Sequence, residues 1–213
     1  GPKVIGELLK ENLELHIHFS SLEGDNMQGI CEISERNLQK ISCLTTANTS
    51  LALFKIPPSK PLQEVGLTLV LDAVRDPGNL GTIIRLCDWF GVTQLVCSLD
   101  TVDCYNPKVI QATMGSIARL PIHYLDIQAY LKQSRAPVYT AMMDGANVYD
   151  TPLPSDAILI MGNEANGVSQ KIQDFSTHPI SIPQFGAIQD TESLNVASAT
   201  AILLSEFARA TEM

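Results

Sequence analysis

The hydrophobic and polar positions along the chain follow two different patterns, and the change between them falls near residue 59. Before that point the patterns are short. Residues 3–10 and 34–42 have the spacing of helices with one apolar side. The patterns of residues 13–19 and 51–56 predict strands. In residues 13–19 apolar and polar residues alternate, so we expect the apolar side of this strand to face the core. The pattern predicts a small α/β unit over residues 1–59.

Beyond residue 66, predicted strands alternate with predicted helices. Residues 67–71 form a continuous apolar run, as expected of a strand that is covered on both faces. Residues 79–90 repeat apolar positions at helical spacing, and Asn106 can cap another helix with Pro107 in its first turn. Further strands are predicted at residues 94–98, 121–123, 138–141, 157–161 and 179–182, and a last helix at about 193–210. This alternation predicts an α/β fold, with a mostly parallel sheet and helices on both faces.

The stretch Pro57-Pro58-Ser59-Lys60-Pro61 separates the two patterns. Proline interrupts helices and removes a donor from strand ladders, so this stretch is expected to be a linker. The predicted domains are therefore residues 1–59 and residues 60–213. The opening residues lack the layout of a signal peptide and resemble the interior of a protein, so we expect the natural chain to start further upstream.

The composition fits a globular protein. Of the 213 residues, 45% are hydrophobic and 17% are charged, which is enough apolar material for a sizeable core. No apolar run approaches the ~18–20 residues of a membrane span. The five cysteines are odd in number and have no CxxC spacing, and the four histidines have no metal-like spacing. We therefore expect no disulfide framework, no metal and a cytoplasmic protein.

The net charge of −9 argues against a protein that coats nucleic acid by bulk electrostatic attraction. It leaves open an enzyme with a local basic patch. In that case the few cations must be clustered. Arg75, Lys108 and Arg119 are the candidates for contact with a nucleic acid.

Three polar or glycine-rich segments follow predicted strands, namely residues 72–85, 161–167 and 182–196. In folds of this kind, ligands bind beyond the carboxyl ends of the strands. Each segment alone has a simpler interpretation, because residues 76–79 also form an excellent turn and Ser193 could be only a helix cap. The dinucleotide motif GxGxxG and the phosphate loop GxxxxGK[ST] are absent, which argues against a Rossmann or P-loop site.

Taken in order, the three segments resemble the motifs of the SpoU (TrmH-like) family of RNA 2′-O-ribose methyltransferases, in the SPOUT superfamily. The first contains Asn79-x-Gly81, then Arg85 and Phe90-Gly91. The second contains Gly162-x-Glu164-x-x-Gly167. The third contains Ile182-Pro183, Gly186 and Ser193-Leu194-Asn195-Val196. The resemblance covers roughly residues 67–210.

This resemblance implies a C-terminal trefoil knot, a homodimer and the cofactor S-adenosyl-L-methionine. The second and third motifs would form the cofactor pocket, with Met161, Gly162, Gly167, Ile182, Pro183, Ser193, Leu194 and Asn195. The last predicted helix is rich in small residues, which permit close contact within one chain or between two. Residues 1–59 resemble the small ribosomal-protein-like RNA-binding domain that often precedes this catalytic domain, although its usual opening segment is absent.

By resemblance, the polar chemistry belongs to Asn79, Arg85, Glu164, Ser193 and Asn195. The implied reaction moves a methyl group from the sulfonium of the cofactor to a ribose 2′-oxygen, so the hydroxyl must lose its proton. Guanidinium pKa values exceed ~12, which makes Arg85 a poor base. We expect Arg85 to stabilise the developing alkoxide and Glu164 to hold the motifs together.

Two other functions stay open. A non-catalytic RNA-binding protein would keep the fold without the chemistry, although Arg85 and Asn195 are both present. An unrelated α/β enzyme would use another nucleotide, such as NAD. The third motif also has a longer spacer, residues 187–192, than the family commonly has, which puts the transfer of its substrate contacts in doubt. The two-part layout favours ribosomal RNA over transfer RNA as the substrate.

Overall fold

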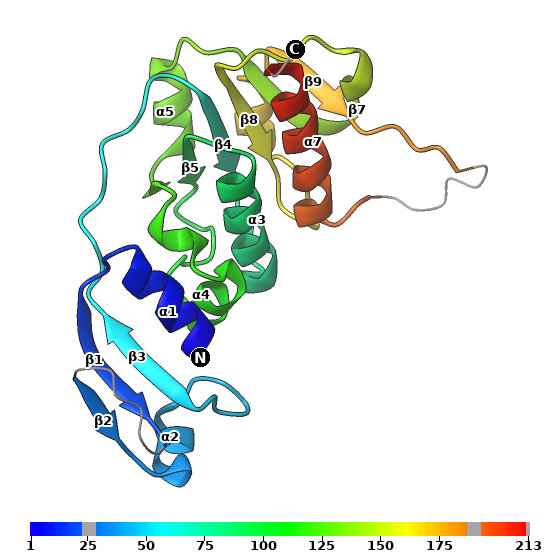
Figure 1. Cartoon of the computed structure of the whole chain (residues 1–213). Helices are drawn as coiled ribbons and strands as arrows, with labels where there is room; N and C mark the ends of the chain where they lie inside the picture. Colours follow the sequence, from blue (N-terminus) through cyan, green and yellow to red (C-terminus); the bar gives the residue numbers. More distant parts are fainter. Residues whose placement is uncertain (23–28, 187–192, 212–213) are drawn as a thin grey trace.

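The computed structural model describes residues 1–22, 29–186 and 193–211. Figure 1 shows a small N-terminal part, drawn in blue and cyan, and a larger part that contains the rest of the chain. The small part contains α1 (Pro2–Lys10), β1 (Leu15–Ser20), β2 (Ile30–Glu32), α2 (Glu35–Ile41) and β3 (Ser50–Phe54). Its strands form a sheet of their own in the order β2-β1-β3.

The larger part is an α/β domain built on one six-stranded sheet. Its strands are β4 (Leu67–Leu71), β5 (Gln94–Cys97), β6 (Ile122–Tyr124), β7 (Val138–Asn147), β8 (Ala157–Met161) and β9 (His178–Ser181). Its helices are α3 (Pro77–Trp89), α4 (Pro107–Thr113), α5 (Ile127–Gln133), α6 (Gln170–Gln173) and α7 (Val196–Thr211), with 3-10 turns η1 (Ser116–Ala118) and η2 (Val148–Asp150). The predicted alternation of strands and helices is confirmed.

The strands of the larger sheet lie in the order β6-β5-β4-β8-β7-β9, and all neighbouring pairs are parallel. Their carboxyl ends therefore share one edge. From β4 the chain winds through β5 to β6 on one side, and it then crosses to build β7, β8 and β9 on the other side. The winding changes direction between β4 and β8, and this is where doubly wound folds form a crevice.

Alternate residues of β4 point into two cores. Leu69 and Leu71 pack with residues of α3 and α7 in one core. Val70 packs with residues of α5 and α6 in the other. Figure 1 shows α3 and α7 side by side, and the two helices are in contact. The double coverage explains why residues 67–71 form a continuous apolar run.

Side-chain caps determine where the two helices next to the motifs begin. Asp76 accepts a hydrogen bond of 2.8 Å from the backbone amide of Asn79, so α3 begins at Pro77, two residues before the predicted start. Asn195 accepts from the backbone amide of Ala197 at 2.9 Å. The cap of α7 is therefore Asn195, and Ser193 lies before the helix.

The buried side of β1 is the opposite of the predicted one. His18 and Ser20 are buried, whereas Leu15, Ile17 and Phe19 are only half-buried. β1 is the central strand of a sheet with only three strands. Because few elements cover such a small sheet, its large apolar side chains stay partly exposed to solvent.

Other elements differ in extent. The pattern does not predict β2, α5 or α6, which are too short to show a clear period. β7 is longer than predicted because it continues past β8 and pairs with β9 across a register shift between Ala141 and Ala146. The cap of α4 is Asn106, as predicted. In the described segments, no helix is long and apolar enough to cross a membrane.

The small part is joined to the α/β domain by an ion-pair cluster around Arg119, directly after η1. The guanidinium of Arg119 donates to Asp88 on α3 at 2.6 Å and to Glu11, directly after α1, at 3.0 Å. The hydrogen bond from Arg119 holds the pKa of the Asp88 carboxyl below its ordinary value. One arginine thus bridges two segments that are far apart in the sequence.

Candidate functional site

A pocket of about 770 Å³ lies between β7, the loops after β8 and β9, and the start of α7. We call it the first pocket. The segments that the family resemblance assigns to the cofactor meet here. The assigned residues that line it are Met161, Gly162, Gly167, Ile182, Pro183, Ser193 and Leu194. Of the assigned residues, only Asn195 is outside the lining.

The loop after β8 forms one wall of the first pocket and closes on itself. Asn163 and Gly167 exchange two backbone hydrogen bonds, of 2.9 and 2.8 Å. The side-chain oxygen of Asn163 also accepts from the backbone amides of Ala165 and Asn166. A Cβ atom on Gly162 would lie 2.1 Å from the carbonyl carbon of Gly167, and Gly167 has a φ of +65°. Both motif positions therefore require glycine.

A chain of hydrogen bonds connects the three motifs beside this wall. Asn79, near the start of α3, donates from Nδ2 to Oε1 of Glu164 at 2.9 Å. Asn195 donates from its own Nδ2 to Oδ1 of Asn79 at 3.0 Å. Asn79 is therefore held between the second and third motifs.

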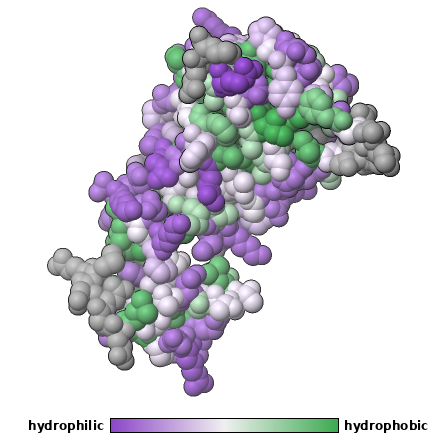
Figure 2. Space-filling model, turned by 45° about the vertical axis from the view of Figure 1, so that its right-hand side comes forward, coloured by the Kyte–Doolittle hydropathy of each residue, from purple (hydrophilic) through white to green (hydrophobic). Residues whose placement is uncertain are grey.

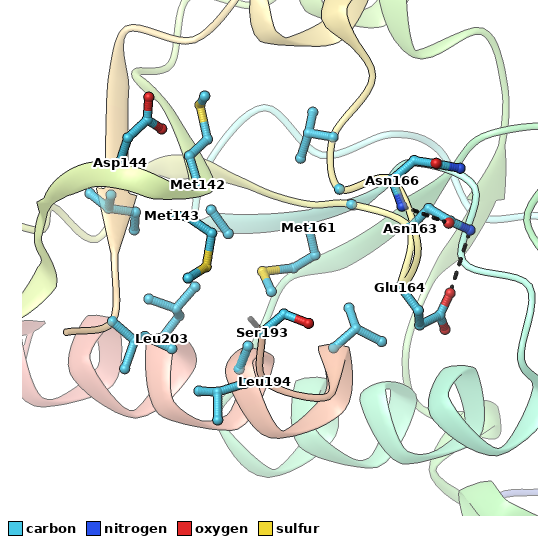
Figure 3. Close-up of a pocket in the computed structure, with 18 of the residues that line it drawn as sticks. Met142, Met143, Asp144, Met161, Asn163, Glu164, Asn166, Ser193, Leu194 and Leu203 are labelled. Atoms are coloured by element: carbon cyan, nitrogen blue, oxygen red, sulfur yellow. Dashed lines mark hydrogen bonds between the residues drawn. The ribbon is translucent and has the colours of Figure 1, made fainter. Parts of the chain in front are cut away.

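Figure 3 shows how the labelled residues are distributed along the pocket. Asn163, Glu164 and Asn166 lie at one end, and Met161 and Ser193 lie in the middle. The residues at the other end include Met142, Asp144 and Leu203.

The sequence motifs do not predict the end of the pocket formed by Met142, Met143 and Asp144. These residues belong to the part of β7 beyond residue 141, where the hydrophobic pattern predicts that the strand stops. The only signal in the sequence is the polar pair Asp144-Gly145 directly after an apolar run. Leu203, on α7, has the spacing of an ordinary core residue.

Arg85 lies outside the first pocket. It is exposed on α3, and it makes no hydrogen bond or ion pair with the residues that the structure describes. It follows Asn79 by six residues, which corresponds to ~9 Å along a helix axis. Its charge is therefore free to meet a molecule that approaches from solvent.

The three cations proposed for RNA contact differ in their surroundings. Arg75 is exposed and lies 3.4 Å from a carboxylate oxygen of Asp100. Lys108 is exposed at the start of α4, with no ion pair to any described residue. The RNA contact of Arg119 stays a prediction, but two carboxylates already hold its guanidinium.

The cysteines lie away from the first pocket. All five are free, and Cys87, Cys97 and Cys104 are buried. Burial raises the pKa of all three thiols, that of Cys104 to about 11. They are therefore protonated at neutral pH. Within residues 1–22, 29–186 and 193–211, no group of three or more His, Cys, Asp or Glu side chains could hold a metal ion.

The chain is similar to known methyltransferases in sequence. The profile of the SpoU rRNA Methylase family matches residues 66–205. The 23S rRNA (guanosine(2553)-2'-O)-methyltransferase RlmP of Bacillus subtilis is 35% identical over 151 residues, which cover 69% of this chain and 60% of that protein. An uncharacterised tRNA/rRNA methyltransferase of Synechocystis is 32% identical over 154 residues, which cover 70% of this chain and 55% of that protein. The chain thus spans less than two thirds of the length of these relatives.

Solved structures extend the similarity to nearly the whole chain. A TrmH-family protein from Porphyromonas gingivalis has a TM-score of 0.84 and 37% identity, covering 98% of this chain and 88% of its own. An AdoMet-bound rRNA methyltransferase from Sinorhizobium meliloti has a TM-score of 0.82 and 26% identity, covering 98% of this chain and 85% of its own. The family profile matches about two thirds of the chain and spans all three motifs, so the chain belongs to the SpoU rRNA methylase family.

Proposed function

We propose that this protein uses S-adenosyl-L-methionine to methylate a ribose 2′-hydroxyl in structured RNA. The observation that supports this most directly is the hydrogen-bond chain from Glu164 through Asn79 to Asn195, which joins the three family motifs beside the first pocket. By its name, RlmP of Bacillus subtilis carries out this reaction on a guanosine of 23S rRNA.

The first pocket fits the proposed cofactor. Its volume of about 770 Å³ is within the ~300–1,000 Å³ of small-molecule sites. Met161, Ile182 and Leu194 supply apolar surface for a flat ring. Because Gly162 has no side chain, a ligand can approach the backbone closely, and backbone amides and carbonyls can form hydrogen bonds with the edge of the ring. Bound S-adenosyl-L-methionine would supply an electrophilic methyl group.

Arg85 is the residue that we assign to the reacting oxygen. Its guanidinium stays charged, and its planar fork can donate to a phosphate and to the 2′-oxygen together. Negative charge grows on this oxygen as the hydroxyl loses its proton. A cation held beside it lowers the energy of the transition state more than that of the ground state.

Asn79, Ser193 and Asn195 are proposed to orient the nucleotide. Glu164 accepts from Nδ2 of Asn79, and Asn195 donates to Oδ1 of the same amide. Because Nδ2 of Asn79 has an acceptor and Oδ1 has a donor, the side-chain amide is held in a single orientation. Glu164 thus acts as a positioning residue, which is a different role from that of a base.

We propose ribosomal RNA before transfer RNA as the substrate, with residues 1–59 as an additional RNA-binding domain. The printed name of RlmP supports ribosomal RNA, whereas the name of the Synechocystis relative includes both kinds of RNA. The cytoplasm, where bacterial ribosomal RNA is made, is the proposed location.

We also propose the trefoil knot and the homodimer of the family, in which each active site borders the other subunit. Met143, Phe185 and Leu194 line the first pocket, and they are 65%, 81% and 50% exposed. Exposed apolar groups that cluster in this way favour an interface. Figure 2 shows hydrophobic residues, in green, gathered on the larger part of the molecule.

Two measurements test the proposed function. Calorimetry with S-adenosylhomocysteine in the presence of EDTA should give one-to-one binding, and NAD should not bind. Labelled S-adenosyl-L-methionine should then transfer its methyl group to total RNA, and mapping should place it on a ribose. Binding of NAD instead, a need for a divalent ion, or a methyl group on a base would contradict the proposal.

A further inference from the structure

We propose that a second pocket, at the same edge of the sheet, binds the nucleotide next to the methylated one in the RNA. This inference rests on the proposed function. The second pocket measures about 500 Å³ and is formed by the loops that follow β4, β5, β6 and β8. Residues 163–167 separate it from the first pocket, and Asn163, Asn166 and Gly167 line both.

The position of the second pocket is that of a nucleotide site. It lies at the carboxyl ends of β4 and β8, where the winding of the sheet changes direction. In open α/β sheets, ligands bind in the crevice at this point. The first pocket is formed further along the same edge, beyond β8. The first pocket therefore does not occupy the crevice between β4 and β8, and another ligand can bind there.

The acidic residues of the second pocket are already used by the fold. Asp72 accepts from the backbone amide of Ser169 at 2.7 Å. Asp100 accepts from the hydroxyl of Ser98 at 2.7 Å, and Asp126 caps α5. Each of these carboxylates therefore has a partner within the protein.

One cation and two side-chain amides of the second pocket are available to a ligand. Lys171 is exposed and has no ion pair with the described residues, whereas Arg75 donates to Asp100 at 3.4 Å. Within the described part of the chain, the side-chain amides of Gln128 and Asn166 have no hydrogen-bond partner. Figure 3 shows the Asn166 side chain at the edge of the first pocket, pointing away from Met161.

An exposed apolar residue completes the set. Leu99 lines the second pocket and is 73% exposed. Lys171 suits a phosphate, the two free amides suit the polar edge of a base, and Leu99 suits the face of a base or a ribose. This combination matches one nucleotide unit. This nucleotide belongs to the RNA substrate, because only residues 163–167 separate the second pocket from the proposed methyl-transfer site.

Filter binding of RNA at several salt concentrations tests the phosphate contact. Lys171→Gln should weaken binding and lower the slope of log affinity against log salt by about 1, as expected for one lost phosphate contact. Lys132→Gln is the matched control, because Lys132 is also exposed, but on α5 and outside both pockets. Equal slopes for the two variants would overturn the proposal. Because the assay does not need methyl transfer, its outcome is separate from that of the proposed function.

Selection from an RNA pool with randomised positions tests the base contact. Gln128→Leu should relax the preference at one position next to the site, while affinity for S-adenosylhomocysteine stays unchanged. An unchanged preference would count against the pocket as a base site. Free nucleoside monophosphates distinguish the alternative source. Binding of one of them that Lys171→Gln abolishes, with RNA affinity unaltered, would assign the pocket to a small ligand and overturn the RNA proposal.

Discussion

At the scale of single residues, Arg85 is the strongest test of the proposed chemistry. Its guanidinium is exposed and unpaired among the described residues, so it contributes little to the fold. Arg85→Ala should lower single-turnover methyl transfer by about two orders of magnitude or more, as the loss of an oxyanion-stabilising donor does. Arg85→Lys should recover only part of the rate, because an ammonium cannot fork onto two oxygens.

The affinity for the cofactor should barely change in Arg85→Ala, because Arg85 does not line the first pocket. Arg135→Ala is the matched control, since Arg135 is also an exposed arginine outside the first pocket. Near-normal turnover in Arg85→Ala would remove the catalytic role. A large loss of cofactor affinity at normal thermal stability would instead place Arg85 in the first pocket.

At the scale of elements, the loop after β8 depends on Gly162. A Cβ atom there would lie 2.1 Å from the backbone of Gly167 and 2.2 Å from that of Val168, and a backbone cannot rotate away as a side chain can. Gly162→Ala should therefore distort the loop and abolish binding of S-adenosylhomocysteine in calorimetry.

Gly6→Ala provides the control for this substitution. Gly6 lies in α1, and no atom lies within 4 Å of the position its Cβ would occupy. Alanine at such a helical site stabilises by ~0.5–1 kcal/mol, so this variant should keep cofactor binding and unfold at a slightly higher temperature. Normal binding by Gly162→Ala would mean that the loop does not form the cofactor wall.

The junction between the small part and the α/β domain depends on Arg119. Its side chain is 35% exposed, so Arg119→Met should cost only ~1 kcal/mol or less of unfolding free energy. The loss should appear first as faster hydrogen exchange in α1, because Glu11 follows that helix directly. Arg36→Met, at an exposed site on α2, should change neither the unfolding free energy nor hydrogen exchange in α1.

The same contact has a definite pH dependence. The hydrogen bond from Arg119 lowers the pKa of Asp88 below its ordinary value of 3.8. As the pH falls, the unfolded chain therefore binds more protons than the folded chain. The stabilisation is present above the ordinary Asp88 pKa of 3.8 and is lost as the pH falls below it. The stability difference between the wild type and Arg119→Met should shrink in urea titrations below pH ~4. A constant difference would exclude Asp88 as the partner that matters.

At the scale of the whole molecule, we expect two chains to associate. Light scattering at micromolar concentration should give twice the 23.2 kDa of one chain. Trp89 at the end of α3 is the only tryptophan and is 83% exposed, so it can report on the association. Its fluorescence should shift to longer wavelength on dilution if the face of α3 lies in the interface.

Trp89→Glu should then favour the single chain, whereas Leu62→Glu, at an exposed apolar site directly after the linker, should not. A protein that is a single chain by light scattering and still methylates RNA at the full rate would remove the shared active site.

The amino-acid sequence by itself determined the order of the longer strands and helices, because the hydrophobic period is a local property of the chain. β2, α5 and α6 are too short to show such a period. The sequence also determined the apolar side of α3 and the Asn106 cap of α4. The structure then showed why the second motif has glycine at residues 162 and 167. Local pattern was less reliable for β1, whose buried residues depend on what covers the sheet, and for β7, which pairs with β9 again at Ala146 and Asn147 after a register shift.

Only the tertiary structure decided which of these residues meet. Asn79 is 85 positions from Glu164 and 116 from Asn195, yet it bonds to both. β4 pairs with β8 across the crevice, and the second pocket forms beside that pairing from four separate loops. A hydrophobic period indicates that a strand is buried, but it does not indicate which strand lies next to it, because many pairings bury the same apolar area. The choice of neighbours, and with it both pockets, therefore came from packing.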